Sequence, residues 1–465
     1  MEHKNVRSSF STSVGFIMAA AGSAVGLGNI WRFPYLAAKD GGGVFILCYI
    51  VLALTFGFAL LTTEIAIGRK TAQSPLTAYG RLHKNWGFLG ALACLVPTLI
   101  LPYYCSIGGW VFKYLFLFCT GNGFSAAEDG YFTGYITEVG QPIFWMLLFF
   151  AATAFVVYSG VNKGIEKYNR ILMPVLVALV VGIACFSLTL ANTGEDGVTR
   201  TGLQGLAVYL VPDFSGMTFS RFLTIIMDAM GQMFFSISVS MGIMVAYGSY
   251  ATKETNLMRS INQIEIFDTV VALLAGMMII PAVYTFMGAE GMSAGPGLMF
   301  VSLPRVFAAM GGAGHLIGAA FFLMTAFAAV TSAVSVMEAI TSSLMDAFHV
   351  SRRRAATFVS AYAMAGGIIV CLGYNLLHFE AALPNGTVGQ ILDLLDYASN
   401  NCIMPLIALL TCVLIGWVVK PQVIIDEVTQ GRCAFPRKRL YVVMIKAVAP
   451  VLMFILLLQS VGVFA

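Results

Sequence analysis

The first apolar stretch of the chain holds several residues that weaken a helix. The segment AGSAVGLGN contains Gly22, Gly26 and Gly28 and ends at Asn29. Glycine lets a ligand approach the backbone, and a break in a spanning helix frees carbonyl oxygens that can coordinate a cation. The N-terminal end of the half-helix after such a break favours an anion. The stretch therefore predicts a helix break at residues 24–28 that binds a charged ligand. The alternative is that these glycines only allow close helix packing.

A second apolar stretch repeats this pattern later in the chain. The segment GQMFFSISVSMGIM, residues 231–244, places Ser236, Ser238 and Ser240 just before Met241 and Gly242. Interruptions in corresponding helices of two halves of a membrane protein indicate a transporter binding site near the bilayer midplane. The second stretch therefore favours the break over the packing interpretation of the first.

Polar side chains inside other apolar runs are further candidates. An acid within a span is costly, so Asp268 is expected to be functional or paired. We expect Glu64 to accept hydrogen bonds from backbone amides of the second break, in preference to relaying protons. The adjacent hydroxyls of Thr331 and Ser332 suit sodium, although hydroxyls in helices often bond back to their own helix. Tyr103 and Tyr104 lie mid-span, whereas a membrane belt would place tyrosines at the interface.

The elements that must position these residues are long apolar helices. Hydrophobic residues make up 59% of the 465-residue chain and charged residues only 10%, whereas soluble domains have roughly 25% charged residues. A run of about 20 apolar residues spans a bilayer. We count eleven such runs, which predict an all-α membrane protein with one transmembrane domain over residues 1–465, without a nucleic-acid partner. The runs are about 13–38, 43–68, 86–118, 141–160, 165–191, 222–250, 260–287, 314–347, 355–374, 388–419 and 439–463.

The distribution of Lys and Arg predicts the orientation in the membrane. Most of them fall in loops on the side of the N-terminus, which predicts a cytoplasmic N-terminus and an external C-terminus in the inner (plasma) membrane. The basic start and small residues of the first run resemble a signal peptide, but the apolar sequence continues beyond the cleavage-like site. The nine cysteines show no paired spacing and indicate neither disulfides nor a metal site.

Several motifs resemble one known family. GSAVGLGNIWRFP at 22–34, EIAIGR at 64–69, GQMFFS at 231–236 and AGPGL at 294–298 are similar to the neurotransmitter:sodium symporters, bacterial amino-acid transporter branch. The resemblance extends from Arg7 to about Trp417. It implies a leucine-transporter-like fold with an inverted five-helix repeat, helices 1–5 within 13–191 and helices 6–10 within 222–419. Helices 1 and 6 are unwound, and an eleventh helix lies at 439–463. The family usually has twelve helices.

The resemblance implies two sodium sites. One uses the carbonyls of Gly22, Val25 and Ala328 and the hydroxyls of Thr331 and Ser332. The other uses the Ala24 carbonyl, Asn29, Ser236 and Asp268, where the family often has Asn. When the residues of this span are counted back from Pro281, the residue that matches this family position shifts by one from Asp268. The fixed charge of Asp268 implies that chloride is not required.

The resemblance also implies a site for a hydrophobic L-amino acid, large or aromatic in its side chain. The amine is expected to meet Ser238, Phe235 and the Ala24 carbonyl. The carboxylate is expected to meet amides near Leu27 and Gly28, the Tyr104 hydroxyl and a sodium ion. The apolar wall is expected at Ile100, Val239, Met241 and Val336, and Ser236 and Ser332 belong to both the substrate and the sodium sets.

Two gates are expected around this site, because alternating access requires barriers that are never open together. On the outer side, the resemblance implies a water-bridged pair of Arg32 and Asp396 above Phe235 and Tyr104. On the inner side it implies a pair of Arg7 and Asp346, flanked by Phe10, Tyr250 and Glu338. Arg7 also fits a positive-inside anchor.

Other functions remain to be weighed against this one. A channel is disfavoured by two closing pairs around an enclosed site. An enzyme is disfavoured because the five histidines lie near loops and no H-E-x-x-H motif occurs. A non-transporting amino-acid sensor of the same fold and a symporter of a small or non-α amino acid stay open. The sequence leaves the oligomeric state undetermined.

Overall fold

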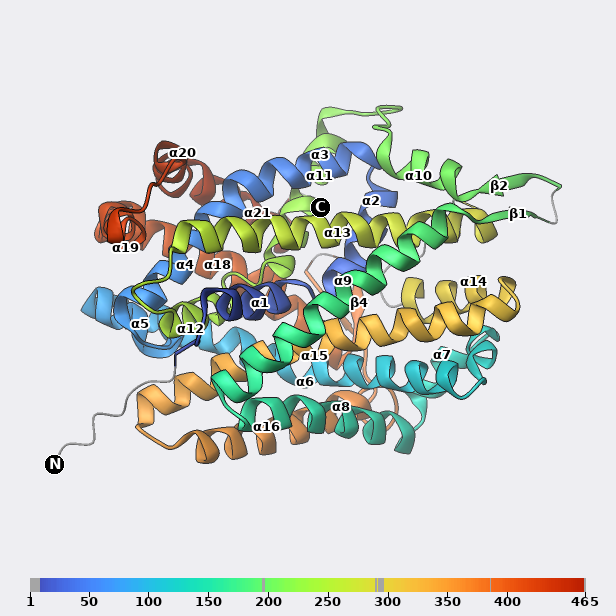
Figure 1. Ribbon diagram of the computed structural model, residues 1–465, viewed down its shortest axis with the longest axis horizontal. Helices are drawn as coiled ribbons and strands as arrows, with labels where there is room; N and C mark the ends of the chain where they lie inside the picture. Colours follow the sequence, from blue (N-terminus) through green and yellow to red (C-terminus); the bar gives the residue numbers. More distant parts are fainter. Residues whose placement is uncertain (1–8, 195–196, 289–290, 292–296, 385, 464–465) are drawn as a thin grey trace.

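A computed structural model describes residues 9–194, 197–288, 291, 297–384 and 386–463. Long helices pack into one bundle, and most of them lie close to the horizontal axis of Figure 1, with α9 crossing obliquely. Within these ranges, nine helices are long and apolar enough to cross a membrane, which confirms an all-α membrane protein. They are Gly43–Thr71, Lys84–Cys119, Gly140–Tyr158, Val161–Leu188, Leu257–Met287, Gly312–Phe348, Arg352–Leu372, Ile391–Val418 and Lys438–Ser460.

The remaining two predicted runs form broken helices. The first consists of α1 (Ser13–Ala24) and a second segment, Gly28–Lys39, which includes α2 (Phe33–Lys39) and is bent by 53° from α1. The other consists of α11 (Phe219–Ser236) and α12 (Ile243–Tyr250), separated by residues 237–242. Neither α1 nor α12 is long enough to span a bilayer alone. Both breaks fall where the sequence places its glycines and serines.

Local conformation explains why the second helix stops. Ser238 has φ of 53°, Ser240 has φ of 63° and Gly242 has φ of 73°. These left-handed angles are unfavourable for residues with a side chain, so the surrounding structure must stabilise them. Ser238 and Ser240 are both buried and both hydrogen-bonded to other segments of the chain. The break is therefore held by tertiary contacts as well as by Gly242.

The continuous spans surround these two broken helices. Gly43–Thr71 includes α3 (Gly43–Leu52) and α4 (Phe58–Thr71), and α6 (Gly87–Cys119), α8 (Gly140–Tyr158) and α9 (Lys167–Leu188) complete the first half. The second half contains α13 (Leu257–Met287), α15 (Gly312–Phe348), α16 (Arg352–Leu372) and Ile391–Val418, with α17 (Ile391–Asp396) and α18 (Met404–Val413). The last span contains α20 (Lys438–Val443) and α21 (Ala449–Ser460). The apolar run predicted from residue 388 begins later as a helix, because 388–389 form strand β4.

Short elements that hydropathy does not reveal connect the spans. They are helices α5 (Pro75–Leu82), α7 (Tyr131–Thr137), α10 (Gly202–Leu210), α14 (Leu303–Ala309) and α19 (Gln422–Val428). Strands β1 (Ala191–Thr193) and β2 (Thr199–Thr201) pair antiparallel, as do β3 (Ala381–Ala382) and β4 (Val388–Gly389).

Candidate functional site

The two helix breaks meet inside the bundle. The Ser238 hydroxyl donates to the Ser23 carbonyl at 3.0 Å, and the Ser23 hydroxyl donates to Ser238 Oγ at 3.1 Å. All of these atoms are buried. Both residues therefore place polar atoms at the centre of a membrane-spanning bundle, where free backbone groups need partners.

A small cavity lies beside this contact. Its volume is about 20 Å³, which is room for a water molecule and too little for an amino acid. A ligand of that size therefore requires the side chains around the cavity to move. The cavity is lined by Ser23, Ala24, Gly26, Gly28, Asn29, Ile100, Tyr104, Phe235, Ser238, Met241, Ile243, Ser332 and Val336.

Most of the residues expected to bind substrate line this cavity, but three do not. Val239 and Ser236 are buried outside its lining, and Leu27 lines a larger, neighbouring cavity. Val239, which the resemblance implies for the apolar wall, does not line this cavity, and its contact with substrate stays a prediction. Sequence reasoning missed Ile243, which contributes apolar surface in its place.

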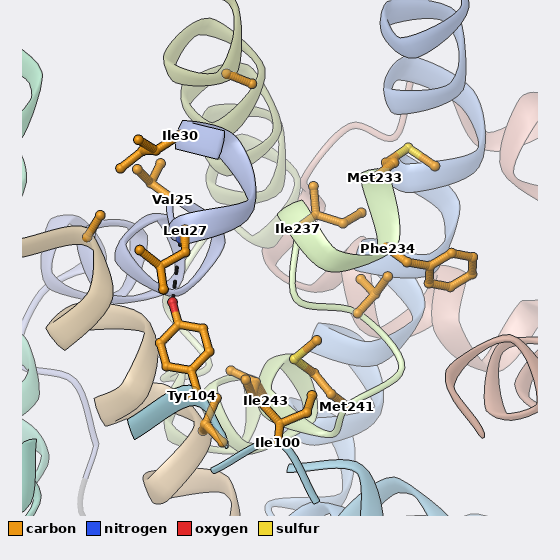
Figure 2. Close-up of a cluster of buried hydrophobic side chains, with 14 of the residues drawn as sticks. Val25, Leu27, Ile30, Ile100, Tyr104, Met233, Phe234, Ile237, Met241 and Ile243 are labelled. Carbon is orange, nitrogen blue, oxygen red and sulfur yellow. Dashed lines mark hydrogen bonds between the residues drawn. The ribbon is translucent and has the colours of Figure 1, made fainter. Parts of the chain in front are cut away.

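Figure 2 shows how Tyr104 and the apolar wall lie relative to the first break. Tyr104 reaches from α6 toward the first break, where the Leu27 amide donates to its hydroxyl oxygen at 3.5 Å. Ile100, Met241 and Ile243 lie together below it. The cavity therefore has an apolar side and a side with backbone groups of the first break.

Asn29, Ser236 and Asp268 form one buried hydrogen-bonded cluster. Asn29 Nδ2 donates to Asp268 Oδ1 at 2.8 Å and to Ser236 Oγ at 2.9 Å. Ser236 Oγ donates to Asp268 Oδ1 at 2.8 Å. All three residues are fully buried. The carboxylate and the hydroxyl thus place their oxygens side by side, and oxygen ligands suit a hard cation. Asn29 turns its Nδ2 toward them, and its Oδ1 accepts from the Gly26 amide at 3.3 Å.

Sequence reasoning missed a fourth member of this cluster. Tyr49 in α3 donates from its hydroxyl to Asp268 Oδ2 at 3.3 Å and to Ser236 Oγ at 3.1 Å. A tyrosine in the middle of an apolar run was the available signal, because a buried hydroxyl usually has a partner. Gln232 Nε2 also donates to the Gly28 carbonyl at 3.0 Å, which links α11 to the first break.

The second expected cation site is partly assembled. Ser332 Oγ lies 3.4 Å from the Gly22 carbonyl, 3.1 Å from the Ser23 carbonyl and 3.4 Å from the Val25 carbonyl. Thr331 instead donates to its own helix, to Phe327 at 3.0 Å and to Ala328 at 3.1 Å. The structure therefore brings Ser332 and the Gly22 and Val25 carbonyls together. The Thr331 hydroxyl donates its proton to carbonyls of its own helix, α15, which is the alternative to sodium binding stated for this residue.

Glu64 contacts the second break, as expected. The Ser240 amide donates to Glu64 Oε1 at 2.6 Å, and Glu64 is buried. Since a left-handed residue inside a span has no helical acceptor for its amide, the carboxylate supplies one. Glu64 therefore supports the break from span Gly43–Thr71.

A larger cavity of about 530 Å³ lies at the predicted outer gate. Arg32 and Asp396 both line it, but within the described residues no ion pair of 4.0 Å or less joins them. Tyr103 Oη donates to Asp396 Oδ1 at 3.1 Å and Asn400 Nδ2 donates to it at 2.6 Å. Phe235 and Tyr104 line both this cavity and the central one. These two rings therefore form the layer between them.

The predicted inner gate is filled by aromatic packing. The Phe10 ring contacts Phe16, Tyr247 and Tyr250 with centroid distances of 5.6, 5.8 and 6.1 Å. The Phe10 amide also donates to the Tyr250 carbonyl at 3.1 Å. Phe10 thus fills the space below α12 and the first break.

The charges expected at the inner side are arranged differently. Tyr250 Oη donates to Glu338 Oε1 at 2.6 Å, and Arg352 donates to both carboxylate oxygens at 2.7 Å. The pairing of Arg352 with Glu338 was not predicted from the sequence. Asp346 Oδ2 accepts from the Ser74 amide at 2.7 Å. Arg7, its expected partner, lies outside the described residues.

The chain is similar to known proteins over most of its length. The model of the "Sodium:neurotransmitter symporter family" matches residues 7–127 and 131–465. The chain is 34% identical to the uncharacterized sodium-dependent transporter YhdH of Bacillus subtilis (strain 168), covering 91% of this chain and 90% of the relative. It is 26% identical to the human sodium- and chloride-dependent GABA transporter 2, covering 91% of this chain and 75% of the relative.

A solved structure is also similar over nearly its whole length. The crystal structure of MhsT in complex with L-phenylalanine superposes with a TM-score of 0.84 at 34% sequence identity. The match covers 98% of this chain and 100% of that chain. The similarity therefore includes both broken helices and the spans around them.

Proposed function

This chain belongs to the sodium:neurotransmitter symporter family and is a sodium-dependent, multi-pass membrane transporter, and we propose that it carries hydrophobic L-amino acids. The observation that carries this proposal is the central cavity between the two helix breaks. Ser238, Ala24 and the amides after the first break provide polar groups at one side. Ile100, Met241, Ile243 and Val336 provide an apolar wall at the other.

We infer the size of the substrate side chain from that apolar wall and from the ligand of one similar protein. MhsT was solved in complex with L-phenylalanine, which supports a substrate with a large or aromatic side chain. Met241 is unbranched and adaptable, so it can make room for a ring. In our proposal the substrate amine lies by Ser238 and Ala24, and its carboxylate lies by Leu27, Gly28 and Tyr104.

Two sodium ions are proposed to accompany the substrate. The Asn29–Ser236–Asp268 cluster with the Ala24 carbonyl would hold one ion, and Gly22, Val25, Ala328, Thr331 and Ser332 would hold the other. Because Asp268 contributes a permanent negative charge, a bound chloride would be redundant at the first site. Moving each ion through 100 mV contributes about 2.3 kcal/mol to accumulation.

Alternating access would use the two closed layers already described. The outer layer is Phe235 and Tyr104 beneath Arg32 and Asp396. The Asp396 carboxylate is half-buried and accepts hydrogen bonds from Tyr103 and Asn400. The inner layer is Phe10 with Tyr250, Glu338 and Arg352. We further propose that 13–191 and 222–419 are inverted repeats, with a cytoplasmic N-terminus and an external C-terminus.

Uptake into proteoliposomes tests the proposal. Labelled Leu, Phe, Trp, Gly and γ-aminobutyrate are presented with an inward sodium gradient, and choline replaces sodium in the control. We expect sodium-dependent uptake of Leu, Phe and Trp. Binding of an amino acid without uptake would identify a sensor instead, and preference for Gly or γ-aminobutyrate would overturn the substrate class.

A further inference from the structure

A second cavity adjoins the predicted outer gate, between that gate and the end of the last span. This side cavity has a volume of about 200 Å³, which is room for several water molecules. Arg32, Asn400 and Asn401 line both the side cavity and the larger cavity that Asp396 lines. These three side chains therefore form the wall between the two cavities. The rest of the side cavity is lined by Met227, Asp228, Gly231, Leu456, Gln459 and Ser460.

Polar groups without partners meet at this side cavity. Arg32 carries several N–H donors, yet within the described part of the chain it makes no hydrogen bond and no ion pair of 4.0 Å or less. Gln459 Oε1 and Asn400 Oδ1 are buried and, among the same residues, accept no hydrogen bond. Buried acceptors nearly always have a donor, so two exceptions beside one guanidinium call for an explanation. A guanidinium that turns into the cavity supplies donors for both oxygens, because its N–H groups form a fork.

A hydrogen bond fixes the Gln459 amide relative to the Asp396 carboxylate. Tyr397, the residue after Asp396, donates from its buried hydroxyl to the Ser460 carbonyl. Ser460 in turn is the residue after Gln459. On the other side of the same turn, Asn400 Nδ2 donates to Asp396 Oδ1 at 2.6 Å. The end of α21 and the turn that carries Asp396 are therefore joined, with one acceptor for a cation on each.

The charges around Arg32 explain why a neutral amide is useful at this place. Asp228 also lines the side cavity, but its Oδ2 accepts from Lys39 Nζ at 2.8 Å and is thus already paired. An ionised acceptor holds a guanidinium more strongly than a neutral one does. The Gln459 amide can therefore receive Arg32 and release it again, whereas a free carboxylate would retain it.

We propose that Gln459 is a positioning residue of the outer gate, which receives the Arg32 guanidinium in the side cavity while the gate is open. Asp396 receives the same guanidinium when the gate closes. Asn400 Oδ1 is the second acceptor in the side cavity. Gln459 thus stabilises the open gate without touching the substrate. The inference rests on the proposed function, because it needs a gate formed by Arg32 and Asp396.

Two substitutions at Gln459 test this role. Gln459→Leu removes the acceptor at similar volume, and Gln459→Glu adds a negative charge at the same size. The same two changes at Gln422 are the matched controls, because Gln422 is exposed in α19 and lines neither cavity. Each change at Gln459 is also combined with Arg32→Gln. Thermal unfolding shows whether each variant is folded.

The measured quantity is the rate at which a water-soluble maleimide labels a cysteine introduced at Ile107 in the purified protein without substrate. Ile107 lines the larger cavity and is 5% exposed, so its labelling reports an open gate. Labelling of the protein without this cysteine is subtracted. We expect Gln459→Leu to slow labelling and Gln459→Glu to accelerate it, each by about tenfold, the effect of one hydrogen bond to a charged group. The Gln422 variants should label at the wild-type rate.

Opposite shifts that disappear when Arg32 is replaced by Gln support the proposal. Shifts in the same direction, shifts that persist without Arg32, or no shift at all overturn it and leave Gln459 a packing residue. If Gln459→Leu does not fold, Gln459→Glu with and without Arg32→Gln decides between these outcomes. Failure of the proposed function is separately visible, because labelling needs no substrate and the wild-type protein would then show no sodium-coupled uptake.

Discussion

The Ser238 hydroxyl donates a 3.0 Å hydrogen bond to the Ser23 carbonyl and so joins the two helix breaks. Ser238→Ala removes this bond and the one from Ser23, and leaves buried polar groups at both breaks. We expect substrate affinity to fall by about fivefold, which corresponds to about 1 kcal/mol. Ser342→Ala is the control, because its buried hydroxyl bonds only to its own helix. An unchanged substrate affinity in Ser238→Ala would show that this hydrogen bond does not contribute to substrate binding.

Asp268 is expected to make chloride unnecessary. Asp268→Asn preserves shape and hydrogen-bonding atoms but removes the negative charge from the cluster with Asn29 and Ser236. We expect the variant to transport poorly in gluconate medium and to recover in part when chloride is added. Wild-type uptake in the same two media is the comparison. A chloride requirement in the wild type would refute the proposal.

Met241 is expected to set the size of the pocket. Met241→Phe fills part of the space against Ile100 and Val336, so it should shift preference from aromatic to aliphatic substrates. Competition of Leu and Trp for a labelled substrate measures the shift in both proteins. Met364→Phe provides a matched control, since Met364 is exposed in α16 and does not line the cavity. If the ratio of Leu to Trp competition is the same in wild type and Met241→Phe, Met241 does not line the substrate pocket.

Glu64 is expected to act as a backbone acceptor. Glu64→Gln retains an oxygen for the Ser240 amide, so transport should persist. Glu64→Leu leaves that amide buried without a partner, which costs about 1–3 kcal/mol and should lower the unfolding temperature. A proton relay would instead fail in both variants. Uptake and thermal unfolding of the two variants distinguish these roles.

Asp40 follows α2, outside the span, and gives the fold a dependence on pH. Burial first, and then the nearby charge of Asp228, raise the pKa of its carboxyl from 3.8 to about 7, against the opposing charges of Lys39 and Arg221. Between these two values the folded state keeps a proton that the unfolded state has lost. The free energy of unfolding therefore falls as pH rises through this window.

Asp40→Asn should remove that dependence. We expect its melting temperature, measured relative to wild type, to increase from pH 5 to pH 8. Asp213→Asn is the control, because hydrogen bonds from Ser215 lower the pKa of that exposed carboxyl and keep its titration below this range. A difference between Asp40→Asn and wild type that stays constant with pH would show that Asp40 does not titrate in this window.

The positions of the two breaks were predictable from sequence alone. Gly26, Gly28 and Gly242, with Ser238 and Ser240 between apolar runs, weaken helices locally, and local conformation depends on nearby residues. The apolar runs likewise predicted the spans, because the length needed to cross a bilayer is a property of one segment. Asn29, Ser236 and Asp268 were grouped through family motifs, and the structure brings them together.

Tertiary structure decided the contacts between segments. Tyr49 on Asp268, Arg352 on Glu338 and Asn169 against Gly22 each depend on how two helices are rotated and displaced against each other. Hydropathy does not determine that rotation, because helices within the bundle can present several apolar faces. The left-handed angle at Ser238 also depends on tertiary structure, because the surrounding packing must stabilise such an angle. The sequence therefore determines where the chain breaks, and the packing determines which oxygens meet there.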